Sequence, residues 1–144
     1  MNVTTKQESY RDIISKLEQH SLKFPQIDIP MSHNLHGGMY SRYVTIPKGI
    51  TVTGQIYKHD HFEVMISGDA TVASESGPIR IKGFNLLSGH AGKKRAVTAH
   101  KKTIWLTIHP TDIKDIDKVQ GSITAFDFNE LDEFISCQKQ IEVN

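Results

Sequence analysis

The feature that most constrains the fold is a series of short runs, rich in β-branched and aromatic residues, between residues 39 and 110. The runs read RYVTIP, ITVTGQIY, FEVMIS, ATVAS, IRIKG, RAVTAH and TIWLTIH. Turn-forming segments such as Pro47-Lys48-Gly49 and Ser76-Gly77-Pro78 separate them, and no helical periodicity lies between them. Strands at such close spacing predict an all-β fold, an antiparallel sandwich or barrel.

The residues before and after this β-rich region show helical patterns. Thr5 and Glu8 have the spacing of a capping box, and the apolar residues that follow recur at helical intervals, which predicts a helix over 5–20. Residues 24–38 carry two prolines and a Gly-Gly pair, and we expect them to form an extended arm and loop. A second helix is predicted over 130–137.

These patterns divide the chain into an N-terminal helix and arm (1–38), a β-barrel (39–111) and a C-terminal connector and helix (112–144). A length of 144 residues is typical of one domain. The formal net charge of +1 gives no reason to expect a nucleic-acid polymer or a membrane as a partner. Cys137 is the only cysteine, which excludes an internal disulfide, and the N-terminus has no apolar signal segment. We therefore expect a cytoplasmic protein.

Two histidines one residue apart, His59 and His61, are the first candidates for a functional site. If residues 55–66 form a strand, successive side chains point to opposite faces. One face then carries a mainly polar set, namely Tyr57, His59, His61, Glu63 and Met65. The opposite face carries the apolar residues Ile56, Phe62, Val64 and Ile66. The polar set is expected to form the wall of a pocket, and the apolar set to pack in a core or against another sheet.

This part of the chain resembles the cupins, small double-stranded β-helix barrels related to jelly rolls. The first cupin motif runs from a glycine through a His-x-His pair and a glutamate to a second glycine, and its matches here are Gly54, His59, His61, Glu63 and Gly68. The stretch 39–110 is also similar to small cupin domains encoded by bacteriophages, through Gly38-x-Tyr40-x-Arg42, Gly92-x-x-Arg95-Ala96 and Trp105-x-x-x-His109. The resemblance implies a single cupin-type barrel with short terminal helices and, for a phage protein, a location in the host cytoplasm.

A metal-dependent cupin enzyme is one functional hypothesis. His59, His61 and Glu63 would hold Fe, Mn or Zn and leave open positions for a small organic substrate. Other candidates for the third ligand are His33, His100 and His109. Two departures from the cupin pattern argue against this hypothesis. Glu63 follows the second histidine by two residues instead of four, and Arg95 stands where the second motif has a histidine, although a cation beside a metal ion is repulsive.

The favoured hypothesis is a small-molecule pocket at the barrel mouth, with no cofactor required, for an anionic, phosphate-bearing ligand such as a nucleotide. Basic residues are densest over 93–102, and arginine can bind phosphate or carboxylate through two parallel hydrogen bonds. The predicted ligand-binding residues are Arg95, Lys93, Lys94, Glu63, His33, His109, Trp105 and Arg42. In the sharpest form a phage protein captures or hydrolyses a nucleotide signal, with His59, His61 and Tyr57 as catalytic acid–base groups.

A third hypothesis is a virion or host-interaction module whose barrel performs no chemistry, so the sequence leaves open whether the protein is an enzyme. The two predicted helices are too short to be stable alone and must pack on the barrel or on a neighbouring subunit. Barrels of this kind also expose sheet edges that a second copy can cover. We therefore expect a homo-oligomer, a dimer or larger.

Overall fold

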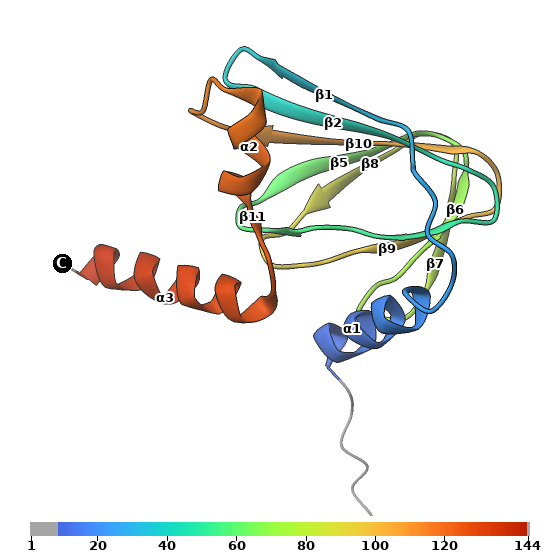
Figure 1. The fold of residues 1–144 in the computed structure, drawn as a ribbon, viewed down its shortest axis with the longest axis horizontal. Helices are drawn as coiled ribbons and strands as arrows, with labels where there is room; N and C mark the ends of the chain where they lie inside the picture. Colours follow the sequence, from blue (N-terminus) through green and yellow to red (C-terminus); the bar gives the residue numbers. More distant parts are fainter. Residues whose placement is uncertain (1–8, 144) are drawn as a thin grey trace, which may run out of the picture.

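The computed structural model describes residues 9–143 and shows a β-barrel followed and preceded in the chain by helices (Figure 1). All strand pairs are antiparallel, which confirms the predicted all-β class. The larger sheet has the order β1-β2-β10-β5-β8 and consists of β1 (Met31–His36), β2 (Met39–Ile46), β5 (His61–Ser67), β8 (Asn85–Gly89) and β10 (Thr103–Pro110). The smaller has the order β3-β9-β6-β7 and consists of β3 (Thr51–Thr53), β6 (Asp69–Val72), β7 (Ile79–Lys82) and β9 (Ala96–Ala99). A third ladder pairs β4 (Ile56–Tyr57) with β11 (Thr124–Ala125).

The main hydrophobic core lies between the two sheets. Its buried members are Val44, Ile46, Met65, Ala70, Val72, Val97, Ala99 and Trp105. They come from strands of both sheets at every second position, because successive side chains of a strand point to opposite faces. Burial of each large apolar side chain contributes about 1.5–3 kcal/mol, so this cluster holds the two sheets together.

The first helix, α1 (Tyr10–Ser21), begins later than the sequence predicts. Ser9 caps it, since the Ser9 hydroxyl accepts a hydrogen bond from the backbone N–H of Asp12 at 3.2 Å. The predicted capping pair, Thr5 and Glu8, lies outside the described residues.

α1 docks on the barrel through one buried side chain and several polar contacts. Ile14 is fully buried, and Glu18 accepts hydrogen bonds from Thr53 and Lys94. The Tyr10 hydroxyl donates a hydrogen bond to the backbone oxygen of Lys94, 2.7 Å away. The helix therefore fixes the segment that leads into β9.

β1 forms an edge of the larger sheet, where the sequence predicts an arm, so that prediction was wrong for residues 31–36. β1 pairs with β2 from Met31 opposite Val44 to His36 opposite Met39. The polar run Ser32-His33-Asn34 interrupts the apolar alternation that would mark a strand in the sequence. An edge strand with one face in solvent can carry many polar residues, so the sequence does not identify β1 as a strand.

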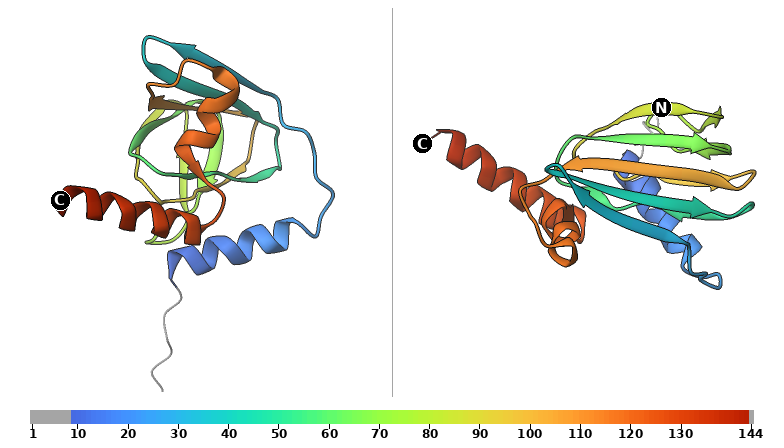
Figure 2. Two further views of the ribbon diagram at one scale, coloured as in Figure 1. Left: turned by 60° about the vertical axis from the view of Figure 1, so that its left-hand side comes forward. Right: turned by 90° about the horizontal axis from the view of Figure 1, so that it is seen from above.

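α2 (Ile116–Ile123), which the sequence does not predict, closes one end of the barrel (Figure 2, left). Val119 and Ile123 pack against Tyr40 and Tyr57 in a second buried cluster. The chain then enters β11, and the backbone N–H of Lys58 donates to the backbone oxygen of Ile123 at 2.8 Å. Backbone pairing thus holds this helix over the barrel end.

α3 (Phe128–Val143) is longer than predicted and projects away from the barrel (Figures 1 and 2). Its first turns are anchored, since Leu131 is fully buried beside Gly92 and Asp132 pairs with Arg11 of α1 at 3.0 Å.

Gly68, between β5 and β6, is expected to be intolerant of a side chain. Its φ of 126° is rarely adopted by other residues, and a Cβ there would lie 2.7 Å from the Cα of the buried Thr103. We expect Gly68→Ala to lower the free energy of unfolding by at least about 2 kcal/mol in denaturant titrations. The control Gly121→Ala, where a Cβ meets no atom within 4 Å, should change it by about 1 kcal/mol or less. Equal stability of the two variants would contradict the packing argument.

Candidate functional site

The larger sheet turns its polar side chains into the barrel. Along β10 the inward residues Thr103, Trp105, Thr107 and His109 are all buried, whereas Ile104, Leu106 and Ile108 alternate with them on the outside. β5 repeats the pattern, with His61, Glu63 and Met65 inward and Phe62 and Ile66 exposed on the outer side. The polar set of this strand therefore forms an interior wall.

Strand register brings the inward polar groups together. Thr107 of β10 lies opposite Glu63 of β5 on one side and opposite Arg42 of β2 on the other. His109 lies opposite Tyr40 in the same ladder. Directly paired residues of an antiparallel ladder are about 4.5–5.5 Å apart at Cα, so these side chains share one interior.

Three aromatic rings meet at the end of the barrel that α2 closes. The ring centroids of Tyr57, His61 and His109 lie 4.4–4.6 Å from one another. Gly89 leaves room for His61, because a Cβ at that position would overlap the imidazole ring. The Nδ1 atom of His61 donates to the backbone oxygen of His59 at 3.0 Å, which orients the ring.

A buried ion pair joins β5 to the segment before β9. The Nε of Arg95 donates to a carboxylate oxygen of Glu63, and its Nη2 donates to the backbone oxygen of Ser88 at 3.2 Å. Burial by itself would raise the pKa of Glu63, but contact with His61 and the charge of Arg95 outweigh it and lower this pKa. Glu63 is therefore ionised at neutral pH.

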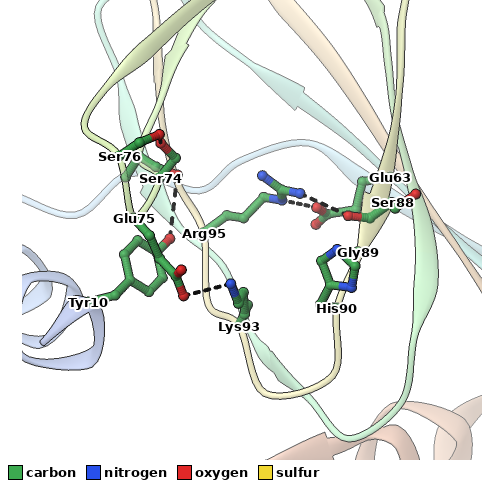
Figure 3. A pocket seen from close by; sticks show the side chains of 11 residues that line it. Tyr10, Glu63, Ser74, Glu75, Ser76, Ser88, Gly89, His90, Lys93 and Arg95 are labelled. Carbon is green, nitrogen blue, oxygen red and sulfur yellow. Dashed lines mark hydrogen bonds and ion pairs between the residues drawn. The ribbon is translucent and has the colours of Figure 1, made fainter.

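The pair forms the inner wall of a polar cavity of about 380 Å³, called here the mouth pocket (Figure 3). It lies between α1, the turn after β6 and the end of β8. Its lining consists of Tyr10, Glu63, Ala73, Ser74, Glu75, Ser76, Ser88, Gly89, His90, Lys93 and Arg95. The volume lies within the range of small-molecule sites.

The same ion pair also borders a smaller space of about 60 Å³ inside the barrel, called here the inner cavity. Its other lining residues are Arg42, Val44, Ile46, Val52, Gly54, Tyr57, Val97, Trp105 and Thr107. Glu63 and Arg95 line both spaces and thus form the partition between them.

Three of the four cations predicted to bind an anion, all except Arg42, already have carboxylate partners. Arg95 pairs with Glu63, and Lys93 pairs with Glu75 at 2.6 Å. Lys94 points elsewhere and pairs with Glu18 of α1, so it does not line the mouth pocket. Both side chains of the Lys93 pair are largely exposed, so this contact is weak and easily rearranged.

His59 lies outside the interior, so the prediction that it shares a face with His61 was wrong. β5 begins at His61, and the preceding residues bend, which breaks the alternation. His59 is exposed and packs edge-on against Phe134 of α3 at 5.5 Å. The structure therefore separates the two histidines of the His-x-His pair.

The remaining predicted residues divide between the two spaces. Tyr57, Arg42 and Trp105 line the inner cavity, and His109 lies buried beside Tyr57. His33 is hydrogen-bonded to Tyr40 and lines neither space. Sequence reasoning missed several residues of the mouth pocket, namely Tyr10, Ser74, Glu75, Ser76, Ser88 and His90. No local pattern marks them, because α1 and the turn after β6 reach the pocket only in the folded chain.

Among the side chains that the structure describes, no three His, Cys, Asp or Glu residues converge in a geometry that could hold a metal ion. His59 is directed outward, and Arg95 occupies the carboxylate of Glu63. We therefore derive no chemical step through a metal.

Solved structures share this architecture. A cupin superfamily protein from Desulfitobacterium hafniense superposes with a TM-score of 0.51 at 14% identity, over 64% of this chain and 87% of that chain. KdgF from a Halomonas species superposes with a TM-score of 0.51 at 14% identity, over 63% of this chain and 89% of that chain. The chain has a cupin fold. No family model matches its sequence, and a search of curated proteins found no match.

The predicted cupin-type barrel is thus confirmed, and at this identity the likeness concerns the fold alone. Among the described residues, no helix is long and apolar enough to cross a membrane.

Stability of this protein should fall as the pH drops, because of His109. Burial, helped by the nearby His61, lowers the pKa of His109 from 6.5 to about 4. Between these values the unfolded chain binds a proton that the folded chain does not, so the free energy of unfolding decreases as the pH falls from 6.5 towards 4. From about pH 7 to about pH 5 the loss should reach up to about 2 kcal/mol.

Urea titrations at the two pH values check this expectation, with substitution of His109 by glutamine as the test. His109→Gln should flatten the dependence on pH, whereas the control His36→Gln, at an exposed residue of β1, should leave the wild-type slope unchanged. An unchanged slope in the His109 variant would assign the effect to other groups.

Proposed function

We propose that this cupin binds a small anionic molecule in the mouth pocket. The observation that carries the proposal is the ion pair between the buried Glu63 and the partly exposed Arg95 at the inner wall of a polar cavity of ligand size. A buried ion pair contributes little net stability, whereas charged groups with perturbed pKa values in clefts are typical of functional sites.

The charge balance supports an anion over a neutral compound. The mouth pocket alone is balanced, since Lys93 and Arg95 face Glu63 and Glu75, and the inner cavity behind the partition adds the cation Arg42. The excess of one positive charge suits a ligand with one net negative charge, and the serine hydroxyls of the lining suit a ligand rich in hydroxyl groups.

The arrangement supports binding rather than turnover. Of the predicted catalytic groups, His59 lies outside, and neither Tyr57 nor His61 lines the mouth pocket, although His61 contacts its wall residue Glu63 from the barrel end that α2 closes. The proposed binding requires no cofactor.

A phosphate-bearing ligand is the sharper form of the proposal. A phosphate dianion would have to draw Lys93 from Glu75 or Arg95 from Glu63, whereas a carboxylate needs less compensation. The nucleotide ligand, the bacteriophage relationship and the cytoplasmic location remain predictions.

Thermal unfolding of the purified protein with a ligand panel tests the proposal. The panel contains nucleoside monophosphates, sugar phosphates, sugar acids and the corresponding neutral sugars. An anionic member should raise the melting temperature in a concentration-dependent way, and at a hundredfold excess over Kd it should stabilise by about 2.7 kcal/mol. The ligand class is identified by which compounds, phosphates or carboxylates, raise the melting temperature more.

Substitutions localise the binding. Lys93→Ala should weaken it without loss of the fold, because the Lys93–Glu75 pair is exposed, and the control Lys102→Ala, at an exposed lysine outside the pocket, should not. Equal stabilisation by the neutral sugars would refute the anion class. No stabilisation by any member would favour a module that binds no small molecule.

A further inference from the structure

The inner cavity contains polar groups that the fold leaves unsatisfied. Thr107 is 6% exposed, and its hydroxyl has no hydrogen-bond partner among the described residues. The buried Nε of Arg42 has none either. A buried polar group without a partner costs about 1–3 kcal/mol, so two of them bordering one cavity suggest that a bound group satisfies both.

Register places the two groups side by side. Arg42 lies directly opposite Thr107 in the β2–β10 ladder, and both border the cavity. A single acceptor group between the strands can therefore accept hydrogen bonds from the Arg42 guanidinium and the Thr107 hydroxyl together.

Arg42 has no ion-pair partner among the side chains that the structure describes, and it is only half-buried. Its enclosed Nε faces the cavity side, whereas its Nη2 contacts the sulfur of the exposed Met31 at 3.8 Å at the protein surface. The other guanidinium of the cavity, that of Arg95, already pairs with Glu63. A water molecule could accept the hydrogen bonds, whereas an anion would accept them and also pair with the charge of Arg42.

We propose that the inner cavity is a subsite for one carboxylate-sized monoanionic group, held by Arg42 and Thr107. A space of about 60 Å³ has room for such a group and not for a sugar ring or a nucleotide. The inference rests on the proposed function. The body of the ligand occupies the mouth pocket, and its acidic end lies beyond the partition, in the inner cavity.

The single tryptophan reports on this cavity, because Trp105 lines it. The probe is sodium formate, with formamide as the neutral compound of the same size, and the readout is Trp105 fluorescence. We expect a saturable change with formate and none with formamide. Arg42→Gln should weaken formate binding at least roughly tenfold, and Lys48→Gln, which removes an exposed charge in the turn after β2, should retain it.

Thr107→Val separates a binding role from a structural one. Without formate this variant should unfold at the same or a higher temperature, because it removes an unsatisfied hydroxyl, while its affinity for formate falls. A purely structural hydroxyl would lower the unfolding temperature instead. Equal responses to formate and formamide, a retained response in Arg42→Gln, or no saturable response at all would overturn the subsite and leave a cavity for water.

The outcomes separate this inference from the proposed function. If formate binds to wild type and to Lys93→Ala alike, but no larger anion stabilises the protein, the subsite stands and the mouth pocket fails. If the affinity for a larger anion falls in Lys93→Ala but is unchanged in Arg42→Gln, the mouth pocket stands and the subsite fails.

A second, independent feature is the outer face of the larger sheet. Its outward positions on the four adjoining strands are Met39, Ser41, Tyr43 and Thr45 of β2, Ile104, Leu106, Ile108 and Pro110 of β10, Phe62, Val64 and Ile66 of β5, and Leu86 and Ser88 of β8. None of these residues is charged. Phe62 and Leu86 are 53% and 60% exposed. Sheets that face water normally carry polar residues on that side.

The smaller sheet of the same protein provides the contrast. Its outward ladder positions carry Asp69 and Lys82 in one row and Thr71, Arg80 and Thr98 in the next. The outside of the smaller sheet therefore carries charged residues, whereas the outside of the larger sheet carries none at the positions named above.

We infer that the outer face of the larger sheet binds the same face of a second copy. Around a twofold axis each residue meets its own counterpart or a neighbour, so a charged residue near the axis would face a like charge, and an uncharged face avoids this conflict. The face ends in a hollow of about 520 Å³ whose apolar wall is Met39, Phe62, Ile108 and Pro110 and whose polar rim includes Asp60, His61 and His90. The apolar wall can receive apolar side chains of the second copy.

Sedimentation and light scattering measure the oligomeric state. Wild type should have twice the monomer mass at micromolar concentration, Leu86→Glu should be monomeric with an unchanged melting profile, and the control Thr98→Glu on the smaller sheet should remain dimeric. Monomeric wild type, or a dimer that persists in Leu86→Glu, would overturn the inference.

Discussion

The polar side chains of β5 and β10 point into the barrel, and much of the rest of the structure compensates for the free-energy cost of burying them. Glu63 loses water when it is enclosed, and an unpaired carboxylate there would cost several kcal/mol. Arg95 supplies the compensating charge from the segment before β9, and α1 holds that segment through Tyr10 and Glu18. The ion pair, the helix and the wall of the mouth pocket are thus one connected arrangement.

The same orientation leaves an apolar surface on the outside of the larger sheet. Because side chains alternate along a strand, turning Thr107 and His109 inward necessarily turns Leu106 and Ile108 outward. These outward residues therefore do not contribute to the barrel core, which consists of residues from the smaller sheet and from the opposite end of the larger sheet. Interior polarity and outer hydrophobicity have a single cause.

Closure of one barrel end by α2 decides which interior groups can reach a ligand. The rings of Tyr57, His61 and His109 lie beneath it, and burial keeps His109 neutral at physiological pH. The partition formed by Glu63 and Arg95 instead faces the mouth pocket. The polar interior thus has a shielded end, which serves stability, and an accessible wall, where a ligand can bind.

The sequence by itself determined the all-β class, the strand alternation and the inward set of β5 from His61 onward, because side-chain periodicity is a local property of the strand. It also singled out Arg95 and Glu63. Only the tertiary structure decided that His59 leaves the interior, since a bend before β5 breaks the alternation. The pairing of Arg95 with Glu63 and of Lys93 with Glu75, and the places of Tyr10 and His90 in the pocket lining, depend on contacts between segments far apart in the chain, for which no local pattern exists.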